Sequence, residues 1–160
     1  MKPLFEEPAG REARPLWDEV PGTVMAQIEN ILKDKIIGAE IAWGGYSPSA
    51  AFVVTLASGK KVFIKGTHPG QDAHGTQMLR QEIDAFKIIP EIEIYSPSFL
   101  GLAGDGGEDG WMLAVFEYID TSPMLPWTEK KLTAVFHLLK QLHQEKNIPQ
   151  GIPPARDKNF

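Results

Sequence analysis

The sequence predicts an α+β fold, in which a five-stranded antiparallel sheet carries one inserted helix and is followed by a linker and one further helix. Two patterns indicate this fold. Short runs typical of strands lie on both sides of a segment whose apolar residues recur at helical spacing. Between two of these runs, Ser58-Gly59 supplies a tight turn, since glycine accepts the positive φ that hairpin turns need.

Residues 1–22 are rich in Pro, Gly and charge and lack hydrophobic periodicity, so we expect a flexible N-terminal segment. Over residues 24–36 the apolar positions are spaced as on a helix, with Thr23 available as N-cap, which predicts a short amphipathic helix leading into the sheet. Three strands then form an antiparallel meander: residues 37–43, 51–57 and 61–65.

The inserted helix is expected over residues 76–89, where Pro90 closes it. Two further strands, 98–103 and 111–119, flank a glycine-rich loop at 104–110 that we expect to be flexible. Residues 23–119 would therefore form one lobe.

A change of composition at residues 120–127 predicts a hinge or linker. A helix is then expected over residues 128–146, with Thr128 as N-cap, and residues 147–160 are expected to form a flexible tail. One face of that helix is apolar: Leu132, Val135, Phe136, Leu139 and Leu142. An apolar face of this kind normally packs against another element, so we expect it to be partly exposed here and to promote self-association.

The composition excludes several classes of protein. Without cysteine, the chain has no disulfide, no thiolate nucleophile and no Cys-based zinc site. The formal charge of −5 argues against general nucleic-acid binding, which needs a basic surface. No apolar run approaches the roughly 18 residues of a membrane helix, and the first residues lack the hydrophobic stretch of a signal peptide. We therefore expect a soluble, cytoplasmic protein without nucleic-acid or membrane partners.

Glu82 is the most informative single residue, because the spacing places it in the middle of the apolar stripe of the inserted helix. An ionised carboxylate there needs a cation from another element. Lys65 ends the strand that precedes this helix and is the natural candidate. A lysine held in this way can be aimed at phosphate oxygens. The alternative is an ion pair with a purely structural role.

Two neighbouring features fit a bound nucleotide. Phe63 shares a strand face with Lys65, because side chains alternate with period two, so its ring can lie against a planar base; the alternative is a core phenylalanine. Upstream, residues 44–48 form either an ordinary hairpin connection or a phosphate-covering loop, in which glycines let backbone N–H groups approach the oxygens. The order of these parts is that of a kinase N-terminal lobe.

Five segments are together similar to parts of one family: Trp43-Gly44-Gly45-Tyr46-Ser47-Pro48, Val62-Phe63-Ile64-Lys65, Arg80-Gln81-Glu82, Tyr95-Ser96-Pro97 and the strand from Gly110 to Ile119. On these segments the chain resembles the aminoglycoside phosphotransferase family, whose fold is kinase-like. The resemblance covers roughly residues 21–146. It implies a nucleotide loop, a third strand with its lysine, the start of the inserted helix, the proline before the fourth strand, and a hinge strand, in that order.

The resemblance implies an ATP site in this lobe. The phosphates would be held by Lys65, which Glu82 positions, and covered by the loop that contains Gly44, Gly45 and Ser47.

Adenine would lie against Phe63 with Phe116 behind it, and would hydrogen-bond to the backbone of Glu117 and Ile119. Family members usually have glycine where this chain has Thr121, which puts the path after the hinge in question.

The family's catalytic loop carries His-Gly-Asp with a downstream Asn, and a later Asp binds magnesium, but the sequence contains neither motif. Without these groups the acceptor hydroxyl is not oriented and the transferring charge is poorly offset. We therefore expect a chain truncated before the catalytic loop and inactive alone, with Mg²⁺ and a small alcohol acceptor relevant only to a full-length relative. The alternative is a non-catalytic kinase remnant that binds a protein.

Overall fold

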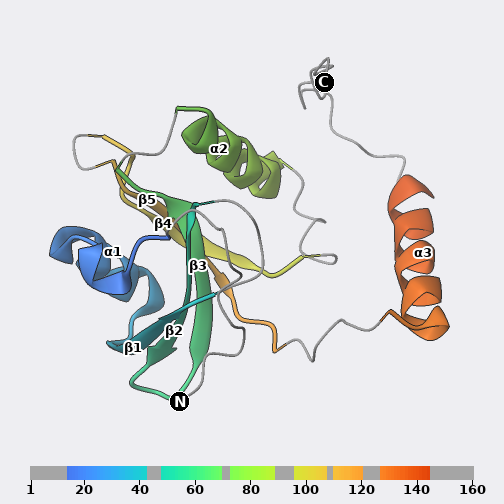
Figure 1. Cartoon of the computed structure of the whole chain (residues 1–160), viewed down its shortest axis with the longest axis horizontal. Coiled ribbons are helices and arrows are strands. Elements are labelled where there is room, and N and C mark those ends of the chain that lie inside the picture. The colour runs from blue at the N-terminus through green and yellow to red at the C-terminus, as the bar shows by residue number, and fades with distance from the viewer. Residues whose placement is uncertain are drawn as a thin grey trace. The chain divides into compact units, whose positions relative to one another are not determined.

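Figure 1 shows the computed structural model of the chain, which describes residues 14–42, 48–69, 73–88, 96–107, 110–120 and 127–144. The chain forms two compact units, Met1–Ile119 and Asp120–Phe160. The first unit holds η1 (Trp17–Glu19), α1 (Gly22–Leu32), β1 (Ile36–Ile41), β2 (Ala50–Leu56), β3 (Lys61–Thr67), α2 (Ala73–Ile88), β4 (Phe99–Ala103) and β5 (Met112–Glu117). The second unit holds α3 (Glu129–Gln144).

The five strands form one antiparallel sheet in the order β1-β2-β3-β5-β4. The predicted α+β fold and the meander of the first three strands are confirmed. After β3 the chain leaves the sheet to form α2, and it returns through β4, which becomes an edge strand because β5 inserts between β3 and β4. β3 and β5 are therefore central strands, paired on both sides.

The helices α1 and α2 cover opposite faces of this sheet (Figure 1). Ile28 of α1 packs in a buried cluster with Val115 of β5. Ile83 of α2 packs in a second cluster with Ala114, the neighbouring residue of the same strand. Because successive residues of a strand point to opposite faces, the sheet is the middle of three layers.

The N-terminal segment is ordered further than the sequence predicts. The prediction of flexibility through residue 22 is wrong for residues 14–22, which pack on the α1 face. Trp17 meets the Phe52 ring edge-on at a centroid distance of 5.1 Å, and Val20 is 2% exposed. Two large apolar side chains are enough to anchor a segment that is otherwise polar. The residues before Arg14 lie outside the described part of the chain.

Both ends of α1 differ from the prediction. Pro21, not Thr23, is the N-cap, and its carbonyl accepts the first two hydrogen bonds of the helix. The helix ends at Leu32 because Lys33 adopts the left-handed conformation with φ of 54°. Ile36 continues the helical pattern of apolar residues only by coincidence, since it begins β1 and pairs with Leu56.

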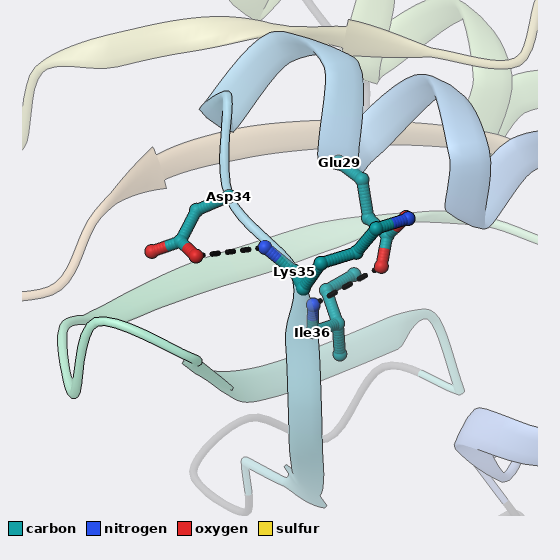
Figure 2. Close-up of polar contacts among 4 residues, drawn as sticks. All are labelled: Glu29, Asp34, Lys35 and Ile36. Carbon is teal, nitrogen blue, oxygen red and sulfur yellow. Dashed lines mark hydrogen bonds and ion pairs between the residues drawn. The ribbon is translucent and has the colours of Figure 1, made fainter.

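Hydrogen bonds to two carboxylates fix the corner between α1, β1 and the turn after β2 (Figure 2). Glu29 accepts from Lys35 Nζ at 2.6 Å and from the Ile36 N–H at 3.1 Å. Asp34 accepts from the backbone N–H of Lys35 at 2.8 Å and from that of Ser58 at 3.3 Å. The bond from the Lys35 side chain lowers the pKa of Glu29, and a hydrogen bond from the Ser58 side chain is the main cause that lowers the pKa of Asp34.

The hairpin between β2 and β3 forms as predicted. Gly59 adopts φ of 83°, and its N–H donates to the Leu56 carbonyl at 2.9 Å. β3 runs two residues further than predicted, through Gly66 to Thr67. A Cβ at Gly66 would lie 1.9 Å from the carbonyl oxygen of Met112, so only glycine lets β3 pair closely with β5 at this point.

The second unit is described by α3. Thr128 is its N-cap, as predicted, because Thr128 Oγ1 accepts from the N–H of Lys131 at 3.3 Å. Phe136 is 66% exposed, and Leu132 and Leu139 are also exposed. Most of the linker predicted over residues 120–127 lies outside the described residues. Within the described ranges, no helix has both the length and the apolar character that a membrane crossing requires.

Candidate functional site

Lys65 lies on the face of β3 that α2 covers. Its paired residues on the two neighbouring strands are Ala51 of β2 and Ala114 of β5. Directly paired residues of antiparallel strands project to the same side of the sheet, so only methyl groups flank the lysine. The long side chain therefore has room to extend over the sheet.

The ion pair between Lys65 and Glu82 is present, as the sequence predicts. Lys65 Nζ lies 2.6 Å from Glu82 Oε1, a charge-assisted hydrogen bond between strand and helix. The side chain of Lys65 is 36% exposed and that of Glu82 is 39% exposed. A pair with this exposure contributes about 0.2–1 kcal/mol to stability. The pair therefore adds little to stability, while the 2.6 Å contact places the ammonium group beside α2.

The expected central burial of Glu82 is wrong. The buried stripe of α2 centres on Leu79 and Ile83, whereas the apolar Met78 is 51% exposed. Glu82 lies at the edge of the stripe, and this explains why its carboxylate keeps contact with solvent. The spacing of apolar residues predicted the correct face of the helix, but it placed the centre of the buried stripe too close to Glu82. The actual centre lies nearer Ile83, which is buried, than Met78, which is half-exposed.

A row of apolar side chains crosses the sheet beside the lysine. Phe63 pairs with Val53 on one side and with Phe116 on the other. The Phe116 ring also packs against Phe86 of α2 at a centroid distance of 5.5 Å. Phe63 is half-buried against the same cluster, so it takes part in the core on the α2 side.

The lysine lies between a carboxylate and an aromatic ring. Lys65 Nζ is 5.4 Å from the centroid of Phe116, which is within the range of a cation–π interaction. Together with Glu82, this contact holds the ammonium group over the boundary between the alanine row and the aromatic row. The arrangement presents a cation next to a half-buried aromatic surface.

The two hinge residues expected to bind adenine lie at and beyond the end of β5. The backbone N–H of Glu117 donates to the Ser98 carbonyl at 2.9 Å, so this N–H is already used within the sheet. Ile119 follows the strand and is exposed. Of the backbone groups of Glu117, the carbonyl is therefore the one to consider for a base.

The glycine loop is described only at its end. Gly44, Gly45 and Ser47 lie outside the described residues, so the structure does not report on their predicted role. Pro48, where the described chain resumes, is held by a contact between its carbonyl and His68 Nε2 at 3.2 Å.

Sequence reasoning named Glu82 and Phe116 but missed the small residues that pair with Lys65 and Phe63 on the neighbouring strands. Ala51 and Val53 could have been found, because counting back from the Ser58-Gly59 turn along both strands of the hairpin pairs them with Lys65 and Phe63. The pairing of Lys65 with Ala114 of β5 could not be found, since nothing in the sequence fixes the register between strands separated by a helix. Phe116, which pairs with Phe63, was expected near it only from the family resemblance. Among the described residues, no group of three or more His, Asp or Glu side chains is placed to hold a metal.

Comparisons with known proteins add no assignment. No protein-family model, no curated protein and no solved structure matches the chain. The candidate site is therefore defined by the geometry around Lys65.

Proposed function

We propose that the unit Met1–Ile119 is the ATP-binding lobe of a small-molecule phosphotransferase with a kinase-like fold, similar to the aminoglycoside phosphotransferase family. One observation carries the proposal: the Lys65–Glu82 pair, with Nζ and Oε1 2.6 Å apart, lies beside the aromatic residues of β3 and β5. A nucleotide needs this combination of an apolar surface for its base and a fixed cation for its phosphates.

The spacing along β3 supports this reading. Lys65 and Phe63 are two residues apart on one strand face, which separates them by about 7 Å. In the proposal the base lies against Phe63, with the buried Phe116 behind it, and the ribose spans the gap. Lys65 then contacts the α and β phosphates, while Glu82 keeps its ammonium group in place.

The remaining parts of the proposed site complete the nucleotide contacts. The loop with Gly44, Gly45 and Ser47 covers the phosphates, and the Glu117 carbonyl and the Ile119 backbone hold the edge of adenine. The proposal concerns ATP binding by these residues, because the sequence has no His-Gly-Asp motif. In the family that the chain resembles, the catalytic loop and a later magnesium-binding Asp serve Mg²⁺ and an alcohol acceptor such as an aminoglycoside, so neither is part of this proposal.

Calorimetric titration of the full chain with ATP tests the proposal. Replacing Lys65 with Ala removes charged hydrogen bonds worth about 1.5–3 kcal/mol, so ATP affinity should fall roughly ten- to hundredfold. Lys87→Ala is the matched control, because this exposed lysine pairs with Asp84 of its own helix. Adenosine, which has no phosphates, should bind the wild type and Lys65→Ala equally.

Two results would remove the proposal. One is equal ATP affinity for the wild type and Lys65→Ala. The other is a folded wild-type chain that does not bind ATP, which would favour the alternative of a non-catalytic binding module.

A further inference from the structure

Two residues of α2, Glu82 and Arg80, make polar contacts with other elements in the described part of the chain, and only the contact of Glu82 belongs to the proposed site. Glu82 bonds to Lys65 of β3. Two residues earlier, Arg80 Nη2 donates to the backbone carbonyl of Asp105 at 2.6 Å, in the loop between β4 and β5.

The two contacts flank the buried stripe of α2 on opposite sides. At about 100° per residue, Arg80 projects about 100° to one side of Leu79, and Glu82 about 60° to the other. The stripe itself, with Leu79 and Ile83 buried, presses the helix onto the sheet. Apolar contacts of this kind are non-directional, so they resist separation better than rotation of the helix about its own axis.

We propose that Arg80 is a positioning residue, which fixes the rotation of α2 about its axis and so keeps Glu82 against Lys65. The side chains of a helix reach a radius of about 6 Å, so a rotation of about 20° displaces a group there by about 2 Å. Such a displacement would break the hydrogen bond between Glu82 and Lys65. With Arg80 and Glu82 both engaged, rotation in either direction breaks one of the two bonds.

The loop that accepts the hydrogen bond from Arg80 is itself held by several hydrogen bonds in residues 104–107. Asp105 Oδ1 accepts from the Gly107 N–H at 2.8 Å, and the Gly106 N–H donates to the Trp111 carbonyl at 3.0 Å. The loop is also tied to the opposite helix, because the Gly104 N–H donates to a side-chain oxygen of α1 at 2.8 Å. The loop residues 104–107 therefore connect α2, through hydrogen bonds, to both the sheet and α1.

The consequence for nucleotide rests on the proposed function, but the positioning itself does not. When Arg80 is removed, Glu82 should release Lys65 for part of the time. The amine of Lys65 then becomes more reactive, whether or not the chain binds ATP.

Competitive acylation of the full chain, without nucleotide, measures this release. A limiting amount of an N-hydroxysuccinimide ester labels lysine amines, and peptide mass spectrometry gives the labelling rate of Lys65 relative to Lys60, an exposed lysine in the β2–β3 turn. Glu82→Gln sets the rate of the unpaired amine. Arg80→Ala should raise the relative rate toward that value, by about two- to fivefold, as expected for an exposed pair worth up to about 1 kcal/mol.

Three variants make the result specific. Lys87→Ala removes a cation from the same side of α2 without breaking a tie to the sheet, so it should leave the Lys65 rate unchanged. Arg80→Lys keeps a donor for the Asp105 carbonyl and should restore most of the protection. In the double variant Arg80→Ala with Glu82→Gln, the rate should match Glu82→Gln alone, because Arg80 acts through Glu82.

Several outcomes would overturn the inference. They are an unchanged Lys65 rate in Arg80→Ala when Glu82→Gln raises it, and equal rates for the wild type and Glu82→Gln. An additive effect in the double variant would also overturn it. Should Arg80→Ala not fold, Arg80→Gln replaces it in the same comparison.

ATP titration of these variants is a separate arm. If the wild type binds no ATP, the proposed function is wrong, but the labelling still decides the role of Arg80. If it does bind, Arg80→Ala should weaken affinity about as much as Glu82→Gln, with Lys87→Ala unchanged.

Discussion

Gly66, next to Lys65, controls how closely the two central strands approach. Its Cα faces the backbone of β5, where an added Cβ would lie 1.9 Å from the Met112 carbonyl oxygen. Backbone cannot move aside as a flexible side chain can, so Gly66→Ala should destabilise the fold by about 1–3 kcal/mol or more, as overpacking does. Urea denaturation measures the change.

Gly38 in β1 is the matched control, because an added Cβ there would contact nothing within 4 Å. Gly38→Ala should be neutral or stabilise by up to about 1 kcal/mol, since alanine loses less conformational entropy on folding. Similar losses of stability in the two variants would contradict the close approach at Gly66.

Glu82→Gln separates positioning from stability. Glutamine has nearly the same size but no charge, so the Lys65 ammonium loses its ion pair. Because both side chains keep more than a third of their exposure, the free energy of unfolding should change by less than about 1 kcal/mol. ATP affinity should fall about two- to fivefold by calorimetry. Large destabilisation without loss of affinity would show that the pair has a structural role only.

The sequence predicted the partners of this pair better than their surroundings. A carboxylate on an apolar stripe and a lysine at the end of the preceding strand are local features. The exposure of Glu82 depends instead on how α2 sits on β3 and β5, which is set by Leu79 and Ile83 packing against Met112 and Ala114. The spacing of apolar residues within one helix does not predict how that helix packs against segments distant in the sequence.

At the scale of elements, the corner between α1, β1 and the β2–β3 turn should make stability depend on pH. The pKa values of Glu29 and Asp34 are lowered from their ordinary values of 4.5 and 3.8, because hydrogen bonds favour the ionised forms in the folded chain. Their contribution is fully present above those ordinary values. It is lost as the pH falls through the lowered, folded-state values. Urea denaturation between about pH 7 and pH 3 should show falling stability on the acid side.

The substitution Asp34→Asn measures how much of the loss of stability at low pH is due to Asp34. Asparagine cannot ionise, so the share due to Asp34 should disappear and the fall in stability toward low pH should become shallower. The variant should also be less stable than the wild type at neutral pH, where the carboxylate accepts from Lys35 and Ser58. An unchanged slope would show that Asp34 does not contribute to the pH dependence.

Elements with a local signal were predicted well, and elements defined by distant contacts were not. The hairpin at Ser58-Gly59 and the N-cap at Thr128 are written in a few adjacent residues, and both are present. The end of α1 was predicted too late in the sequence, because Ile36 packs as part of β1 and not as part of the helix. The anchoring of Trp17 on Phe52 was missed because their contact joins residues far apart in the sequence.

At the scale of the whole first unit, the two faces of the sheet differ in composition. The face under α1 is lined by fully buried aliphatic and aromatic residues, including Phe52, Ile64 and Val115. The face under α2 combines a smaller buried cluster with the half-exposed side chains of Lys65 and Glu82. The larger buried cluster therefore lies on the α1 face, and the half-exposed ion pair lies on the α2 face.

The second unit carries an apolar stripe on α3 that should promote self-association. Leu132, Phe136 and Leu139 share one side of the helix and are exposed. Contact between stripes of two chains would remove this surface from water, at about 25 cal/mol for each Å² buried. Sedimentation velocity of the full chain should therefore show a mean mass that rises with concentration. Phe136→Lys places a charge in the stripe and should shift the chain toward monomer.

Ala134→Lys provides the control for charge alone. Ala134 is exposed on the same helix but about 160° or more from Leu132 and Phe136, so its substitution adds the same charge outside the stripe. This variant should associate like the wild type, because its stripe is intact. If both lysine variants dissociate equally, net charge rather than the stripe governs association. If the wild type stays monomeric up to high concentration, the stripe does not bring two copies of this chain together.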